Sequence, residues 1–247
     1  LKQVYMSEFK FPTEEVELPS KGLIYAKDNP LSSGKVEMKY MTAREEDILS
    51  NQSYIKKGTV LDKLLDSLII DKNIKTDDLI VGDKNALLIA SRILGYGKDY
   101  EVKIKGESHI IDCSTLENKE FNESEFVAGK NEFSYTLPST DTIITYKLIT
   151  GSDERQINRE IAGLKKINKD ASPELSTRLK HIILSVDGKD EKKDIRDFVD
   201  NYFLARDSRA FRDHIKNTQP DVNLSYILDT GEEVEVPIGL NFFWPDY

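Results

Sequence analysis

The sequence predicts an α+β protein in which helical bundle segments surround a small antiparallel β module, preceded by a β-rich N-terminal arm. Apolar residues recur at helical spacing in two separate blocks, and between and after these blocks the hydrophobic period changes to two. Pro and Gly punctuate the N-terminal stretch. The expected units are an N-terminal β arm or hairpin (1–41), a helical subdomain (42–99), a β region with a first hairpin (100–150), a second helical block (151–221), and a second hairpin with an aromatic C-terminus (222–247).

The first two units have clear local signals. Turn residues surround the apolar run of Leu23, Ile24 and Tyr25, and the alternating residues 35–41 predict a strand. Thr42 followed by Glu45 is a capping box, which indicates a helix over 43–51. Apolar residues at helical spacing predict further helices over 59–70 and 83–96, and amphipathic helices in succession would pack as a small bundle.

The middle of the chain is expected to form sheet. Residues 101–105 and 108–112 alternate on either side of Gly106-Glu107, which predicts a β-hairpin. Further strands are expected over 132–137 and 142–148.

The second helical block begins near Thr150. One helix is expected over 153–168, and Ser172-Pro173-Glu174 is a helix start that should continue through Ile183 to a stop at Asp187-Gly188. The remaining expected elements are helices over 192–202 and 207–216 and strands over 223–228 and 233–236.

Composition narrows the possible partners. The formal net charge of -9 opposes binding to nucleic acid, because a polyanion attracts a basic surface. No run of about 18 apolar residues indicates a membrane span, and the first residues lack the apolar core of a signal peptide. We therefore expect a folded, soluble protein that stays in the compartment where it is made.

The sequence contains no phosphate-binding Gly-rich loop, no paired histidines at zinc-helix spacing and no Gly-x-Ser-x-Gly motif, so neither an enzyme nor a bound cofactor or metal is expected. With Cys113 as the one cysteine, no internal disulfide or multi-thiolate metal site is possible. Cys113 is expected to be a buried thiol, since His109 lies four strand positions away, about 13 Å, too far to share a proton. The acidic run of Glu45, Glu46 and Asp47 fits the first turn of a helix better than an acid/base site.

Two segments favour protein binding. Arg206, Arg209 and Arg212 could bind carboxylates in a bidentate manner, or could form an intramolecular salt-bridge network; the sequence leaves both open. The cluster of Phe242, Phe243 and Trp244 near the chain end must dock into the protein's own core or into a partner. Docking into the core is the favoured interpretation.

Five short segments, spread over nearly the whole chain, together resemble one known family. They are LPSKGLIY at 18–25, TAREEDIL at 42–49, LIASRILGYG at 88–97, ARDSRAFR at 205–212 and VPIGLNFFWP at 236–245. The chain resembles the baseplate hub and hub-assembly proteins of T4-like contractile-tailed bacteriophages. That resemblance implies work in building the tail baseplate hub, in the host cytoplasm during assembly or, for a permanent subunit, within the virion baseplate.

The same resemblance implies a degenerate zinc-ribbon-like module. Relatives carry a Cys-x-x-Cys pair in each of two distant turns, and the corresponding turns here, 105–108 and 228–231, contain no thiols. We therefore expect no zinc and no other cofactor. The two hairpins should still pack side by side, with Ile104 close to Leu228, stabilised by ordinary packing.

The resulting hypothesis is a baseplate hub assembly protein, a chaperone or assembly factor that binds other hub proteins. Alternatives are a stoichiometric structural subunit of the hub, an unrecognised hydrolase, and a glycan-binding module. The oligomeric state is left open. The expected contact residues are Leu23, Ile24, Tyr25, Arg206, Arg209, Arg212, Phe242, Phe243 and Trp244.

Overall fold

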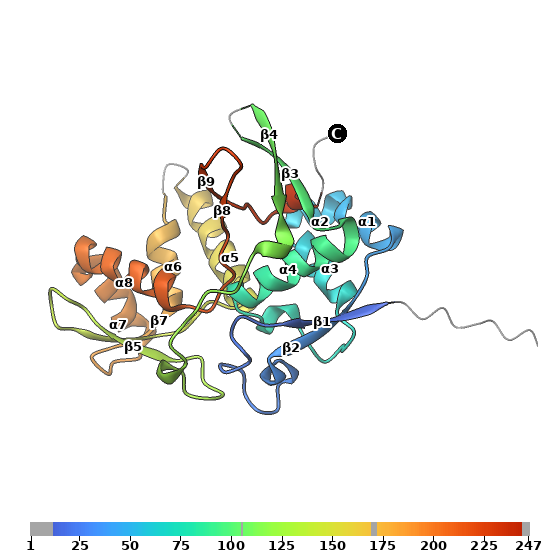
Figure 1. Cartoon of the computed structure of the whole chain (residues 1–247). Coiled ribbons are helices and arrows are strands. Elements are labelled where there is room, and N and C mark those ends of the chain that lie inside the picture. The colour runs from blue at the N-terminus through green and yellow to red at the C-terminus, as the bar shows by residue number, and fades with distance from the viewer. Residues whose placement is uncertain (1–11, 105, 169–171, 244–247) are drawn as a thin grey trace, which may run out of the picture.

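The computed structural model describes residues 12–104, 106–168 and 172–243, and it confirms the α+β class. Helices are combined with four small antiparallel sheets in the described part of the chain, ordered β1-β2, β3-β4, β5-β6-β7 and β8-β9 (Figure 1).

The N-terminal hairpin joins β1 (Thr13–Glu17) to β2 (Lys35–Lys39), and the long loop between them contains the short 3₁₀ turn η1 (Pro30–Ser33). Gly22 has a φ of +75° and lies so close to this turn that an added Cβ would be 2.7 Å from backbone atoms of Leu31 and Gly34. Only glycine fits at this position, so the start of the loop can pack closely against η1 near the end of the loop. Of the two predicted forms, arm or hairpin, residues 12–41 adopt the hairpin, and its loop packs into the core; residues 1–11 lie outside the described residues.

The first helical subdomain contains α1 (Ala43–Leu49), α2 (Gln52–Lys57), α3 (Val60–Leu68), the 3₁₀ turn η2 (Thr76–Asp78) and α4 (Val81–Tyr96). Helices α1, α2 and α4 all contact α3, which confirms the predicted bundle. Helix α2 was not predicted, since it has no apolar repeat. It is defined by its ends, where the Asn51 side chain accepts hydrogen bonds from two backbone N–H groups and Gly58 adopts the left-handed conformation.

The β region begins with the predicted hairpin of β3 (Asp99–Ile104) and β4 (Glu107–Asp112), followed by the 3₁₀ turns η3 (Cys113–Thr115) and η4 (Glu123–Glu125). Strands β5 (Phe133–Thr136) and β6 (Ile143–Tyr146) pair as a second hairpin, and β7 (Ile183–Val186) joins them at the far edge of β6. The prediction that the helix before β7 continues through Ile183 is therefore wrong.

The second helical block contains α5 (Gly151–Ile167), α6 (Glu174–Ile182), α7 (Lys192–Asp197), the π-helical turn η5 (Phe198–Tyr202) and α8 (Ala205–Thr218). The chain then forms β8 (Ser225–Ile227), β9 (Glu233–Glu235) and the 3₁₀ turn η6 (Leu240–Phe242).

The β3–β4 and β8–β9 hairpins are in contact, although more than a hundred residues separate them in the chain. The His109 Nδ1 atom lies 3.2 Å from Asp229 Oδ1, and the Asp112 backbone N–H donates to the Tyr226 hydroxyl at 3.4 Å. This agrees with the expected side-by-side arrangement. The relation of the pair to a zinc ribbon stays a prediction.

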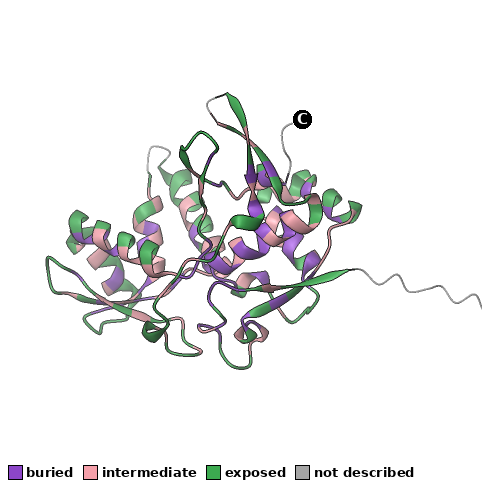
Figure 2. Cartoon of the chain, viewed as in Figure 1, coloured by how far each residue is buried: buried purple, intermediate pink, exposed green. Residues whose placement is uncertain are grey.

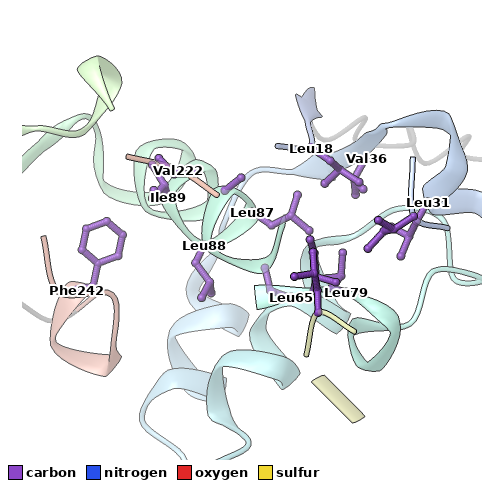
Figure 3. Close-up of a cluster of buried hydrophobic side chains, with 14 of the residues drawn as sticks. Leu18, Leu31, Val36, Leu65, Leu79, Leu87, Leu88, Ile89, Val222 and Phe242 are labelled. Atoms are coloured by element: carbon purple, nitrogen blue, oxygen red, sulfur yellow. The ribbon is translucent and has the colours of Figure 1, made fainter. Parts of the chain in front are cut away.

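A single hydrophobic cluster joins the N-terminal loop, the first helices, the sheets and the C-terminal turn. Figure 3 shows side chains from these distant segments facing one another, and Figure 2 shows the buried positions concentrated where α3 and α4 meet the rest of the chain. The residues labelled in Figure 3 are Leu18, Leu31, Val36, Leu65, Leu79, Leu87, Leu88, Ile89, Val222 and Phe242.

Candidate functional site

Part of the segment ARDSRAFR lies on the inward face of α8 and packs against the protein. Asp207, Ser208 and Phe211 are buried. The Asp207 carboxylate accepts hydrogen bonds from Ser139 N at 3.0 Å and Thr140 Oγ1 at 3.3 Å, which fixes the β5–β6 turn to the first turn of α8. Phe211 packs among aromatic rings of the β5–β6 hairpin. These residues therefore hold the helix on the protein.

The outward face of α8 carries Arg206, Arg209 and Arg212, which are all exposed. A spacing of three residues places them along one side of the helix within about 120° of arc. Arg209 Nε lies 3.9 Å from Asp213 Oδ2 in a pair whose side chains are 81% and 65% exposed, and Arg212 Nε donates only to the Ser208 carbonyl of its own helix. Over the described ranges, no carboxylate lies within 3.5 Å of any of the three arginines. The described contacts therefore do not join the three arginines into an internal salt-bridge network, and the recognition-helix alternative stays a prediction.

Two exposed apolar side chains come directly before these arginines. Tyr202 is 64% exposed and Leu204 is 42% exposed. Tyr202 is the last residue of the π-helical turn η5, and Leu204 comes two residues later. An ion pair between Lys180 and Asp200 at 2.7 Å connects η5 to α6. π-Helical turns are rare in proteins, and those that occur are often found at functional sites. The sequence analysis missed both residues, although an apolar pair next to a basic helix start was a visible signal.

We refer to Tyr202, Leu204, Arg206, Arg209 and Arg212 as the arginine surface. Tyr and Arg are the residue types that most often dominate the binding energy of protein interfaces. The three arginines lie on α8, whose inner side is fixed by Asp207 and Phe211, while Tyr202 ends η5 and Leu204 lies directly before α8.

The N-terminal contact residues have a different role from the one expected. Ile24 and Tyr25 are buried, and Leu23 is half-buried. The Tyr25 hydroxyl donates to Asp83 Oδ2 at 2.6 Å and accepts from the Ile80 backbone N–H at 3.1 Å. Tyr25 thus anchors the loop to the start of α4, and burial removes Ile24 and Tyr25 from any contact surface of the folded chain.

Asp83 is the centre of this buried network. Its carboxylate also accepts from the backbone N–H and the hydroxyl of Ser20, at 2.9 and 2.6 Å. Burial raises the pKa of Asp83, and the hydrogen bonds from Ser20 and Tyr25 act against that rise. Burial raises the pKa of the Tyr25 hydroxyl, and the Asp83 carboxyl group beside it raises this pKa further. The segment LPSKGLIY is therefore a structural clamp on α4.

The C-terminal aromatic residues are also part of the core. Phe242 and Phe243 are fully buried, and the Phe242 ring packs edge-on against Tyr100 with centroids 4.9 Å apart. The favoured prediction of docking into the protein's own core is confirmed for these two residues, and their assignment as partner contacts is wrong. Trp244 lies outside the described residues.

Cys113 and Glu45 have structural environments. Cys113 is buried, and burial raises the pKa of its thiol to about 11, which keeps it protonated and unreactive at neutral pH. Glu45 closes the capping box of α1 by accepting a hydrogen bond from Thr42 N at 2.9 Å, as predicted. The three histidines lie apart on β4, α6 and α8; of these, His181 is 2.9 Å from a carboxylate oxygen of Glu160.

Within 12–104, 106–168 and 172–243, no group of three or more His, Cys, Asp or Glu side chains is placed to hold a metal ion. In the same part of the chain, no helix combines the length and apolar character needed to cross a membrane. No family model, curated protein or solved structure matches the chain.

Proposed function

We propose that this chain is a baseplate hub assembly protein of a contractile-tailed bacteriophage, which works by binding other hub proteins and not by catalysis. The arginine surface is its proposed interface, and the proposed partner surface presents carboxylates. The observation that carries the proposal is the exposure of Arg206, Arg209 and Arg212, whose one carboxylate contact among the described residues is the exposed pair of Arg209 and Asp213 at 3.9 Å, in a chain with 44 acidic residues.

Packing of α8 against the protein uses Asp207 and Phe211 and leaves the three arginines in solvent. With so many carboxylates available, a helix needed only for packing would gain by placing its arginines beside them, even though each exposed pair contributes about 1 kcal/mol or less. A guanidinium group forms two parallel hydrogen bonds with a carboxylate, which gives strength and a fixed geometry when the pair is covered by a partner. Tyr202 and Leu204 supply apolar area that would exclude water from such pairs.

The resemblance to hub proteins supports the biological setting. The segment ARDSRAFR is one of the five that carry the resemblance, and it contains all three arginines. The setting implies action in the host cytoplasm during tail assembly. A stoichiometric hub subunit is the second candidate, since a permanent subunit would use the same exposed interface. An unrecognised hydrolase has less support, since Cys113 and Glu45 occupy structural positions.

The test is an affinity capture of tagged protein from phage-infected cells, with mass spectrometry of the captured proteins and of purified particles. The variant R206E/R209E/R212E should lose captured hub proteins by at least about tenfold. The matched control K27E/K103E/K130E makes the same change in net charge at three exposed lysines outside the arginine surface, and it should capture hub proteins normally.

Hub proteins captured by the wild type but absent for the arginine variant would support the proposal. Absence of the chain from particles would then identify an assembly factor, and presence at a fixed ratio would identify a subunit. Failure of the wild-type protein to capture hub proteins, together with its absence from particles, would refute the hub assignment. Equal capture by the arginine and control variants would refute the interface.

A further inference from the structure

The outward face of the β8–β9 hairpin is acidic and carries one large exposed apolar residue. The pairing of Ser225 with Glu235 and of Ile227 with Glu233 places these four side chains on the same face of the two strands. Ile227 is 70% exposed. An exposed isoleucine opposite a glutamate is a feature that strand formation alone does not require.

This face continues into a groove of about 460 Å³ that is lined by both acidic and basic residues. Glu233 and Glu235 of β9 line the groove together with Lys119, Lys216 of α8 and the buried Asp221. No ion pair within 4 Å joins either lysine to either glutamate in the described part of the chain. The groove also contains apolar lining from Val222, Leu224 and Val234.

We propose that two copies of this chain form a two-fold symmetric dimer through this groove. Ile227 of each copy enters the groove of the other and contacts its apolar lining. Glu233 and Glu235 of each copy meet Lys119 and Lys216 of the other.

The presence of both charges at one groove is what favours a second copy as the occupant. In a two-fold interface the same patch is used twice, so the patch must be complementary to itself. The glutamates come from β9, and the lysines come from α8 and from the loop after η3, so a two-fold axis that passes between the two groups places each opposite its complement. The proposed contact does not use Arg206, Arg209 or Arg212, which do not line the groove, although Lys216 lies one helical turn after Arg212 on the same side of α8.

The contact depends on a small apolar anchor and exposed charges, so the expected dissociation constant is about 1–100 µM. Exposed charge pairs are screened by salt, so dimerisation should weaken as the ionic strength rises from about 0.05 M to about 0.5 M. The single apolar anchor should make Ile227 the most sensitive uncharged position.

The test is sedimentation velocity of the full chain at low salt, up to about 200 µM, with four variants. Ile227→Ser removes the anchor without changing charge, and it should raise the dissociation constant at least about tenfold. The variants E233K/E235K and K119E/K216E each place like charges opposite one another, and each should be monomeric alone. The control E14K/D28K changes charge by the same amount as E233K/E235K at exposed residues outside the groove, and it should dimerise like the wild type.

Mixing the two charge-reversed variants makes every contact complementary again, so an equimolar mixture should recover dimers. Circular dichroism of each variant checks that loss of dimer is not loss of folding, and Ile227→Ser covers the case in which a charge-reversed variant does not fold. A wild-type chain that stays monomeric, complexes that grow beyond a dimer, or a charge-reversed mixture that stays monomeric would each overturn the proposal. Loss of the dimer would leave capture of hub proteins as a separate result.

Discussion

Replacing Glu45 by glutamine should remove a large acid-dependent part of the stability of this protein. The Glu45 side chain is fully buried. One carboxylate oxygen accepts from Lys39 Nζ and Ser67 Oγ, both at 2.7 Å, and the other accepts from the backbone N–H and hydroxyl of Thr42, at 2.9 and 2.7 Å. The carboxylate therefore joins β2, the start of α1, and α3.

The size of the effect follows from the pKa of Glu45. Burial alone would raise this pKa, but the hydrogen bonds from Lys39, Thr42 and Ser67 outweigh burial and lower it from 4.5 to about 2. Since each pH unit corresponds to about 1.4 kcal/mol, the ionised carboxylate contributes about 3 kcal/mol to the free energy of unfolding. A lowered folded-state pKa means that this contribution is fully present above the unfolded value of 4.5 and is lost as the pH falls toward 2.

Urea unfolding followed by circular dichroism, at about pH 6.5 and about pH 2.5, tests this reasoning. Glu45→Gln should lower the free energy of unfolding by about 3 kcal/mol at the higher pH and by less than about 1 kcal/mol at the lower pH. Glu46→Gln, on the exposed side of the same helical turn, should change it by less than about 0.5 kcal/mol at both. A difference between wild type and Glu45→Gln that is the same at both pH values would refute the ion-pair account.

Two substitutions and one measurement of thiol reactivity test the other buried side chains. Tyr25→Phe leaves the Ile80 N–H unsatisfied and removes a donor from Asp83, so it should lower the free energy of unfolding by about 2–4 kcal/mol in urea; a neutral effect would contradict the clamp. Phe242→Ala should lower it by about 3–5 kcal/mol, whereas unchanged stability with weaker hub capture would restore a partner-binding role. Cys113 should react with a thiol reagent at least about a hundredfold more slowly in the native than in the urea-unfolded chain, and equal rates would show that it is accessible.

Features encoded by neighbouring residues could be predicted from the sequence. The capping box of Thr42 and Glu45 needs only two side chains one turn apart, and the β3–β4 hairpin needs only alternation on both sides of Gly106. Burial of Phe242 and Phe243 was the favoured interpretation because exposed aromatic clusters at a chain end are costly. In each of these cases the local pattern has few competing structures.

Features decided by distant partners could not be predicted in this way. Residues 174–183 have helical apolar spacing up to Ile183, but the backbone of Ile183–Val186 pairs with β6, so tertiary pairing ends the helix. Likewise, the apolar loop around Tyr25 looked like a binding arm because its main partner, Asp83, lies 58 residues further along the chain. The sequence of a short apolar run does not show whether its side chains face the core or the solvent.

Helix α8 shows how the structure separates packing from function within one segment. Helical periodicity can place Asp207 and Phe211 on the opposite side from the arginines, but it cannot show whether carboxylates from elsewhere meet Arg206, Arg209 and Arg212. In the folded chain, the described carboxylates lie too far from these arginines for hydrogen bonds. The Asp207 carboxylate instead accepts hydrogen bonds from the β5–β6 turn. The inward residues are accounted for by folding, and the outward arginines are not. The proposed partner is therefore to be sought at the arginine surface and not at the buried N-terminal or C-terminal segments.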